Sequence, residues 1–321
     1  MSDIKARLLS VGTFVPDKVL TNKEIEGFLD TTDEWITTRT GIKERRIVDK
    51  ANPMSASDMG VRASITAMER AGVSPDDIDG IIVATFTPDN FFPSTACRIQ
   101  SDLGCKNAFA FDLSAACAGF VYALTVANNM IVSGQARTML VVGSEVISKT
   151  LDWSDRGTCI LFGDGAGVVV LQAEENHFPS RGILSSCLFS DGSLGDLLKL
   201  PAWGEERFLM MKGNEVFKHA VRFMTDLSLR AIDKAGLDVR DIDLVVPHQA
   251  NIRIISALAE QLSVHIDKVA VNLQKYGNTS SASIPLAFEE AWEHGMVKDG
   301  SKVLFVGVGG GFSVGSAVCV I

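Results

Sequence analysis

The chain has 321 residues, enough for one large domain or two of ordinary size, and its 46% hydrophobic and 21% charged residues are typical of a globular protein. A formal net charge of −9 argues against nucleic acid as a partner. No apolar run reaches the roughly 18 residues of a membrane helix, and the N-terminal segment lacks the apolar core of a signal peptide. We therefore expect a cytoplasmic protein with no membrane partner.

The cysteines show no pattern of cross-linking or metal binding. There are 6 of them, with no CxxC pair and no histidine at zinc spacing. The sequence therefore predicts neither a disulfide framework nor a metal site, and most of the thiols are expected to be small buried hydrophobic groups.

Short apolar runs alternate along the chain with segments of helical spacing. The runs predicted as buried strands are residues 81–84, 108–113, 139–143, 167–171, 244–246, 269–273 and 316–321. The segments predicted as helices include 59–71, 118–133 and 214–235. This alternation predicts an α/β fold with mostly parallel sheets, and in such folds the chemistry gathers at the carboxyl ends of strands.

The chain also contains an internal duplication. The recurring pairs are residues 67–72 with 231–236, 77–79 with 241–243, and 139–143 with 303–307. Each pair is separated by 164 residues (231 minus 67, and 303 minus 139). One offset shared by separate blocks predicts two similar halves, residues 1–174 and 175–321.

Cys117 follows a predicted strand and a turn of small residues, and a helical segment begins directly after it. A thiol at the N-terminus of a helix faces the positive end of the helix dipole, which favours the thiolate. The small neighbours leave room for a substrate. The alternative is a buried structural cysteine.

His248 and Asn278 hold similar positions in the second half. His248 follows the predicted strand 244–246 and precedes a helical segment, a setting that lowers the pKa of an imidazole and favours the neutral ring. Asn278 follows the predicted strand 269–273, which corresponds in the duplication to the strand before Cys117. We therefore expect Asn278 to occupy nearly the place of Cys117. The alternative for Asn278 is a turn or helix-capping residue.

Two glycine-rich segments resemble nucleotide loops only superficially. Residues 307–315 are followed by a predicted strand, whereas a dinucleotide fingerprint needs a helix there. Their backbone N–H groups are better suited to stabilising an oxyanion. Residues 163–167 are predicted to be a turn that enters a strand.

Taken together, these motifs resemble β-ketoacyl-acyl-carrier-protein synthase III, the initiating condensing enzyme of bacterial fatty acid synthesis, within the thiolase-like superfamily. The motifs are DEWI at 33–36, RTGI at 39–42, AACAGF at 115–120, DRGT at 155–158, PHQAN at 247–251, GNTS at 277–280 and GGGF at 309–312. The resemblance covers essentially the whole chain and implies a duplicated fold of five layers, αβαβα.

The resemblance implies a catalytic set of Cys117, His248 and Asn278. Cys117 would take an acyl group, acetyl first among the candidates, from coenzyme A, and the other two would act on malonyl-acyl carrier protein. The backbone N–H groups of Cys117 and Gly310 would form the oxyanion hole. By the same resemblance, Asn278 stands where related subfamilies use a second histidine, a second cysteine or a glutamate. The coenzyme A thioester is a substrate, and no cofactor or metal is implied.

Further sites are implied by the same resemblance. Residues 31–34 have the S/T-x-x-E form of a capping box, which predicts that Trp35 lies in the first turn of a helix. The coenzyme A site would comprise Thr31, Trp35, Arg39, Arg156 and Asn251.

A homodimer is also implied, in which Phe92 reaches the partner's acyl pocket and Ile147 lines that pocket. Arg253 and Lys218 would dock the carrier protein. Glu260 and Gln261 stand where this family often has paired lysines, a departure that bears on the strength of docking.

Three alternatives stay open. A related synthase could use a longer or specialised starter. A non-catalytic homologue would bind acyl-CoA or carrier protein without turnover. The separation of 131 residues between Cys117 and His248 (248 minus 117) resembles that of papain-like proteases, but the C-G-S-C-W motif is absent and the duplication would be unexplained.

Overall fold

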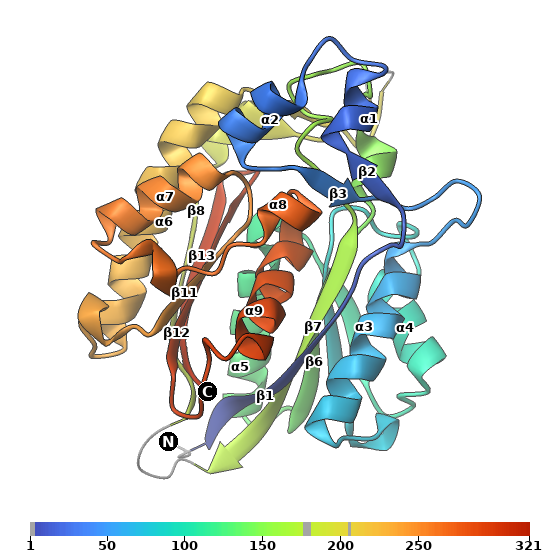
Figure 1. The fold of residues 1–321 in the computed structure, drawn as a ribbon. Helices are drawn as coiled ribbons and strands as arrows, with labels where there is room; N and C mark the ends of the chain where they lie inside the picture. The colour runs from blue at the N-terminus through green and yellow to red at the C-terminus, as the bar shows by residue number, and fades with distance from the viewer. Residues whose placement is uncertain (1–3, 176–180, 205–206) are drawn as a thin grey trace.

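The computed structural model describes residues 4–175, 181–204 and 207–321, which form two mixed sheets separated by helices (Figure 1). The first sheet has the strand order β1 (Ile4–Phe14), β7 (Gly165–Glu175), β6 (Thr138–Glu145), β4 (Gly80–Ala84), β5 (Phe109–Leu113). The second has the order β11 (Leu244–Pro247), β12 (Lys302–Gly309), β13 (Ser313–Val320), β8 (Gly182–Ser190). Two short ribbons pair β2 (Val19–Thr21) with β3 (Glu44–Arg46), and β9 (Leu198–Lys199) with β10 (Met210–Met211).

The helices complete the expected five layers, αβαβα (Figure 1). The outer face of the first sheet is covered by α3 (Ala56–Ala71) and α4 (Thr95–Leu103), and α5 (Gly119–Val132) and α9 (Ser283–Glu293) lie between the sheets. On the far side, α6 (Gly213–Lys234) covers the second sheet with α7 (Ile252–Gln261) beside it. The short helices α1 (Asn22–Glu26), α2 (Asp33–Thr40) and α8 (Leu273–Tyr276) lie at one end of the layers. No helix in the described part of the chain combines the length and the apolar character needed to cross a bilayer.

The central helix layer is held by apolar packing on both sides. Helix α5 contacts strands of both sheets, and its sequence is apolar around most of its circumference, as expected of a helix buried on all sides. Phe305 on β12 meets the ring of Phe120 from α5 at 6.5 Å and that of Phe288 from α9 at 5.0 Å, both edge to face. These contacts fix the two central helices against the second sheet.

The duplication predicted from sequence recurs in the fold. Strands β8, β13, β12 and β11 repeat the neighbour order of β1, β7, β6 and β4. The 3₁₀ turn Ala116–Ala118 is repeated 164 residues later by Ser280–Ala282 (280 minus 116), and both turns begin with a non-glycine residue at positive φ, 46° and 51°. Ser281 therefore holds the place equivalent to Cys117, and Asn278, which was expected to occupy nearly that place, lies three residues before it (281 minus 278).

Two expectations about the strands are wrong. The sheets are mixed: β4 runs parallel to β5 and β6, and β11 to β12, but every other pair in the two sheets is antiparallel. Only residues 310–312 join β12 to β13, a hairpin connection that parallel strands cannot use.

The predicted strand 269–273 is reduced to a single bridge between Val269 and Val245. The backbone leaves the extended conformation at Asn272, with ψ of 6°, and the N–H of Asn272 donates to Oε1 of Gln249 rather than to a neighbouring strand. The second sheet consequently lacks a counterpart of β5. The other strands and helices lie within a few residues of the expected ranges.

We predict that Gly143→Ala destabilises the protein at the junction of the two sheets. A Cβ on Gly143 of β6 would lie 2.4 Å from the carbonyl oxygen of Ser281, and backbone cannot yield as a flexible side chain would. The expected loss in the free energy of unfolding is about 1–3 kcal/mol. Chemical denaturation measures it, with Gly192→Ala as the control because no atom lies within 4 Å of its added Cβ. Equal stabilities of the two variants would contradict this packing.

Candidate active site

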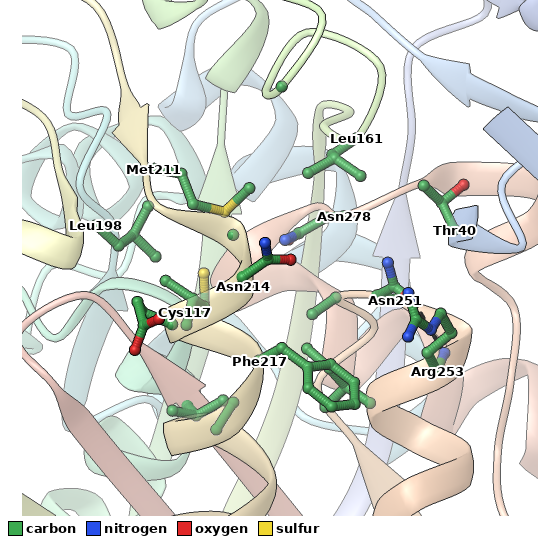
Figure 2. A pocket seen from close by; sticks show the side chains of 18 of the residues that line it. Thr40, Cys117, Leu161, Leu198, Met211, Asn214, Phe217, Asn251, Arg253 and Asn278 are labelled. Carbon is green, nitrogen blue, oxygen red and sulfur yellow. Dashed lines mark hydrogen bonds between the residues drawn. The ribbon is translucent and has the colours of Figure 1, made fainter. Parts of the chain in front are cut away.

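One pocket of about 740 Å³ brings together residues from both halves of the chain. Cys117, His248 and Asn278 all line it. Figure 2 shows the side chains of Cys117 and Asn278 entering the same space from different elements, with Asn251 and Arg253 on the side toward Thr40. The three residues predicted to be catalytic are therefore neighbours in one site.

Cys117 is positioned by a turn that glycines of β12 allow to pack closely. The turn begins at Ala116, at positive φ, and α5 follows directly at Gly119. A Cβ on Gly309 would lie 2.5 Å from the Cys117 nitrogen, and one on Gly307 would lie 3.2 Å from its carbonyl oxygen. Only glycine permits the approach at position 309, which places Gly309 directly against the backbone of the nucleophile.

The expected effect of the helix dipole on Cys117 is wrong in its net direction. Burial raises the pKa of the Cys117 thiol to about 12, and the buried carboxyl of Glu145 adds to the rise. The N-terminus of α5 acts in the opposite sense but does not outweigh the loss of solvent. Burial therefore favours the protonated form of the thiol.

His248 directly follows β11 and is buried. Burial lowers its pKa to about 3, so the ring is neutral throughout the physiological range; this direction was expected, although its main cause is desolvation rather than a helix terminus. The Nδ1 atom lies 2.7 Å from Oγ of Ser283, and the N–H of Gln249 donates to that Oγ at 3.3 Å. The ring is therefore held in one orientation at the pocket wall.

Asn278 is fixed on both sides by backbone. Its N–H donates to the carbonyl of Leu161 at 2.8 Å, and its carbonyl accepts the N–H of Gly163 at 3.0 Å, which makes a parallel bridge at Phe162. The side-chain Oδ1 accepts the N–H of Ser280 at 2.9 Å. Because the amide oxygen is engaged, the amide nitrogen is the atom that Asn278 offers to the pocket (Figure 2).

The pocket mouth carries Trp35 between two guanidinium groups. The central carbons of Arg39 and Arg156 each lie 4.7 Å from the centre of the Trp35 ring. Asn251 also lines the pocket, and its Nδ2 donates to the carbonyl of Arg39 at 3.2 Å. These residues form a cationic and aromatic surface suited to a base and phosphates.

The cap of α2 lies one residue later than predicted. Thr32, not Thr31, accepts the N–H of Trp35 at 3.1 Å, so Trp35 is in the first turn as expected but no capping box forms. Thr31 is absent from the described lining of the pocket.

The remaining predicted residues fall into two groups. Lys218 and Arg253 line the pocket, where Lys218 pairs with Glu215 at 3.3 Å and Arg253 lies 5.4 Å from the ring of Phe217. The structure does not bring Phe92, Ile147 or Gly310 into the lining of this pocket. The Phe92 side chain is 87% exposed beside a separate hollow, and Ile147 is wholly buried in the core. Glu260 and Gln261 are exposed at the end of α7.

Sequence reasoning missed several residues of the site. Leu198, Met211 and Asn214 line the pocket, but they belong to a short ribbon and to a helix end that carry no chemical motif. It also missed Glu145, a buried carboxylate that accepts from the hydroxyl groups of Thr85 and Thr87 and of Ser281. Burial raises the pKa of Glu145 to about 7. The sequence feature that could have revealed Glu145 is an acidic residue just after the carboxyl end of the predicted strand 139–143.

Comparison with known proteins identifies the family of this chain. The family model described as 3-Oxoacyl-[acyl-carrier-protein (ACP)] synthase III matches residues 111–192, and the model of that synthase's C terminal matches residues 232–321. The β-ketoacyl-[acyl-carrier-protein] synthase III of Clostridium acetobutylicum is 48% identical, with 97% of each chain covered. That of Aquifex aeolicus is 47% identical over 97% of this chain and 98% of the relative.

Solved structures give the same result. The crystal structure of the 3-oxoacyl-[acyl-carrier-protein] synthase III from Aquifex aeolicus matches with a TM-score of 0.94 at 46% identity, covering 98% of this chain and all of that one (100%). The priming β-ketosynthase of the R1128 polyketide pathway matches with a TM-score of 0.93 at 38% identity, covering 99% of this chain and 96% of the other. On this evidence of sequence, fold and site, the chain belongs to the β-ketoacyl-acyl-carrier-protein synthase III family of thiolase-like acyltransferases.

Proposed function

We propose that this protein starts acyl-chain synthesis by moving an acyl group from coenzyme A to Cys117 and condensing it with malonyl-acyl carrier protein. The observation that carries the proposal is the single pocket in which Cys117, His248 and Asn278 lie behind a mouth of Trp35 and two arginines. Acetyl is the first candidate for the starter group.

In the first half-reaction the Cys117 thiol loses its proton and its sulfur attacks the thioester carbonyl. The C–S bond to coenzyme A breaks, and the released thiolate takes up a proton. The oxyanion formed on the way is adjacent to the backbone N–H of Cys117, and we assign the second donor to the N–H of Gly310, which follows the glycine packed on the nucleophile.

In the second half-reaction a malonyl thioester enters beside the acyl-cysteine. Neutral His248 and the amide nitrogen of Asn278 donate to its thioester carbonyl, which stabilises the enolate left when carbon dioxide departs. The α-carbon then attacks the acyl-cysteine carbonyl, and the sulfur of Cys117 leaves as thiolate. The product is a 3-oxoacyl thioester two carbons longer than the starter.

The mouth of the pocket suits the nucleotide of coenzyme A. An adenine ring stacks on indole or guanidinium, and arginines pair with phosphates. In the structure Trp35, Arg39 and Arg156 stack on one another, so a base would enter by displacing one guanidinium. We assign Asn251 to the same site because it holds the backbone of Arg39.

We further propose that the protein is a homodimer. Strand β5 is an edge of the first sheet, and its backbone is open to pairing with a second copy. Phe91 and Phe92 are exposed on the loop between β4 and α4, and Phe91 stacks on exposed Trp203 at 5.3 Å. A contiguous exposed aromatic group of this kind is typical of an interface, and it would carry Phe92 toward the partner's acyl pocket. Ile147 belongs to the same buried cluster as Ile160 and Phe162 of the pocket lining, and it would border that pocket from within.

A specialised starter is the second candidate. The likeness to a priming β-ketosynthase of a polyketide pathway, at 38% identity, favours keeping it beside acetyl. Intact-mass measurement after incubation with a panel of acyl-CoAs separates the two, because the mass added to the protein identifies the preferred acyl group.

We predict that Cys117→Ala abolishes this mass increase. The pocket keeps its shape because the substitution removes only the sulfur, so circular dichroism and thermal melting should match those of the wild type. Stable acylation of the alanine variant would move the nucleophile to another residue.

We predict that His248→Ala and Asn278→Ala each still accept the acyl group but decarboxylate malonyl thioester about 10²–10³-fold more slowly, the cost of losing one preorganised donor to an oxyanion. Release of labelled carbon dioxide measures the rate. In the wild type, the decarboxylation rate should not change near pH 6.5, the ordinary pKa of histidine. The pKa of His248 in the folded protein is about 3, so its ring is neutral on both sides of pH 6.5. Unchanged decarboxylation by both variants would remove the role assigned to the pair.

Arg253 is our candidate contact for an acidic carrier protein. It lies at the pocket mouth near Lys218, whereas the protein as a whole carries a net charge of −9, so docking has to be local.

We predict that Arg253→Glu raises KM for malonyl-acyl carrier protein, more strongly at low ionic strength, and spares acylation by a small thioester that lacks a nucleotide. Arg222→Glu is the matched control, because Arg222 stacks on Phe223 of the same helix and is not part of the described pocket lining. Steady-state kinetics at two salt concentrations decide the matter. The docking role fails where both variants show the same KM as the wild type.

A further inference from the structure

Arg45 on β3 is a buried cation that the proposed chemistry does not use. Its side chain has no exposure, and burial lowers its pKa to about 10. Its hydrogen bonds go to neutral acceptors: Nη1 donates to the carbonyl of Leu20 at 3.1 Å and to Oδ1 of Asn22 at 2.8 Å, and Nη2 donates to the carbonyl of Ile160 at 2.6 Å. A charge buried without a carboxylate partner lowers stability, so its place calls for a function.

On one side, hydrogen bonds connect Arg45 through Asn22 to the helix that carries Trp35. Asn22, which accepts from Arg45, donates through Nδ2 to Oδ1 of Asp33 at 2.8 Å and to the carbonyl of Ile42 at 2.7 Å. Asp33 is the first residue of α2 and also accepts the hydroxyl of Thr37 at 3.1 Å. Arg45 is therefore two hydrogen bonds from the start of the helix at the pocket mouth.

On the other side, a hydrogen bond connects Arg45 to the segment that pairs with Asn278. Ile160, whose carbonyl accepts from Arg45, is followed directly by Leu161, and the segment 161–163 makes both backbone hydrogen bonds of Asn278. The Arg45 side chain also packs against this junction: Cβ atoms added to Gly163 and Gly277 would each lie 3.2 Å from the Cβ of Arg45. The neighbouring Arg46 adds a backbone contact, its carbonyl accepting the N–H of Asp164 at 2.8 Å.

We propose that Arg45 is a positioning residue that holds Asn278 in register with helix α2, and so aligns the malonyl-binding donor with the coenzyme A site. It touches neither substrate and acts through Asn22 on one side and Ile160 on the other. A planar guanidinium spans both acceptors at once, which the single ammonium of a lysine does not. The proposal rests on the proposed function, from which it takes the roles of Asn278 and α2.

The test compares Arg45→Met, Arg45→Lys and Arg46→Met in three assays: decarboxylation of malonyl-N-acetylcysteamine, acylation of Cys117 by acetyl-CoA, and acylation by acetyl-N-acetylcysteamine, which has no nucleotide. Arg46→Met is the matched control, because it removes a neighbouring arginine whose guanidinium makes none of these bonds. Folded fraction is measured by circular dichroism and thermal melting.

For Arg45→Met we expect kcat for decarboxylation to fall about 10²-fold, the size of effect that a misplacement of about 1 Å produces. KM for acetyl-CoA should rise several-fold, while kcat/KM for acetyl-N-acetylcysteamine stays at the wild-type value. Arg45→Lys retains the buried charge and can keep the hydrogen bonds on one side only, so it should give an intermediate defect in the first two assays. If Arg45→Met does not fold, the Arg45→Lys variant provides the test. Arg46→Met should match the wild type in all three.

Two results would overturn the proposal. One is a parallel loss of all three activities in proportion to the folded fraction, which marks Arg45 as a purely structural residue. The other is an Arg45→Lys variant with wild-type kinetics. Either result leaves the proposed function standing as long as the wild type is acylated and decarboxylates the malonyl thioester. A wild type with neither activity overturns both proposals.

Discussion

The close packing of two equivalent turns at the centre of the molecule is the constraint on which the rest of the structure depends. Ser281 donates its hydroxyl to the carbonyl of Ala84 at 2.8 Å, which ties the turn of the second half to the carboxyl end of β4 in the first. On the other side, Gly309 of β12 approaches the backbone of Cys117 as only a glycine permits. Each half thus buries the other's turn, and the site cannot form from one half alone.

This burial controls the electrostatics of the site. With little solvent present, His248 stays neutral, the Cys117 thiol stays protonated, and Glu145 carries a pKa of about 7 despite several donors. The same dry surroundings strengthen every hydrogen bond to a developing oxyanion. A site that selects neutral donors and excludes water is suited to decarboxylation, in which charge moves onto a carbonyl oxygen without proton transfer to bulk solvent.

The two halves of the chain share one backbone arrangement, but equivalent positions in them carry different side chains with different roles. The position of Cys117 in the first half is held by Ser281 in the second, where the hydroxyl serves in packing and in the hydrogen bond to Glu145. The candidate catalytic groups of the second half, His248 and Asn278, lie instead directly after β11 and in the segment that replaces a β5-like strand. Because that segment leaves the sheet at Asn272, it is free to pair with residues 161–163 and present Asn278.

The sequence by itself determined the α/β class, the duplication, most strand and helix positions, and the choice of Cys117, His248 and Asn278 as candidate catalytic residues, because each is written in local spacing or in short motifs. The tertiary structure alone decided the strand directions and the loss of the strand predicted at 269–273. It also reversed the expected pKa shift of Cys117, and it showed Arg45 joining α2 to the Asn278 loop. These features depend on burial and on contacts between residues more than 100 positions apart, such as Arg45 with Ile160 (115 apart), which local spacing does not record.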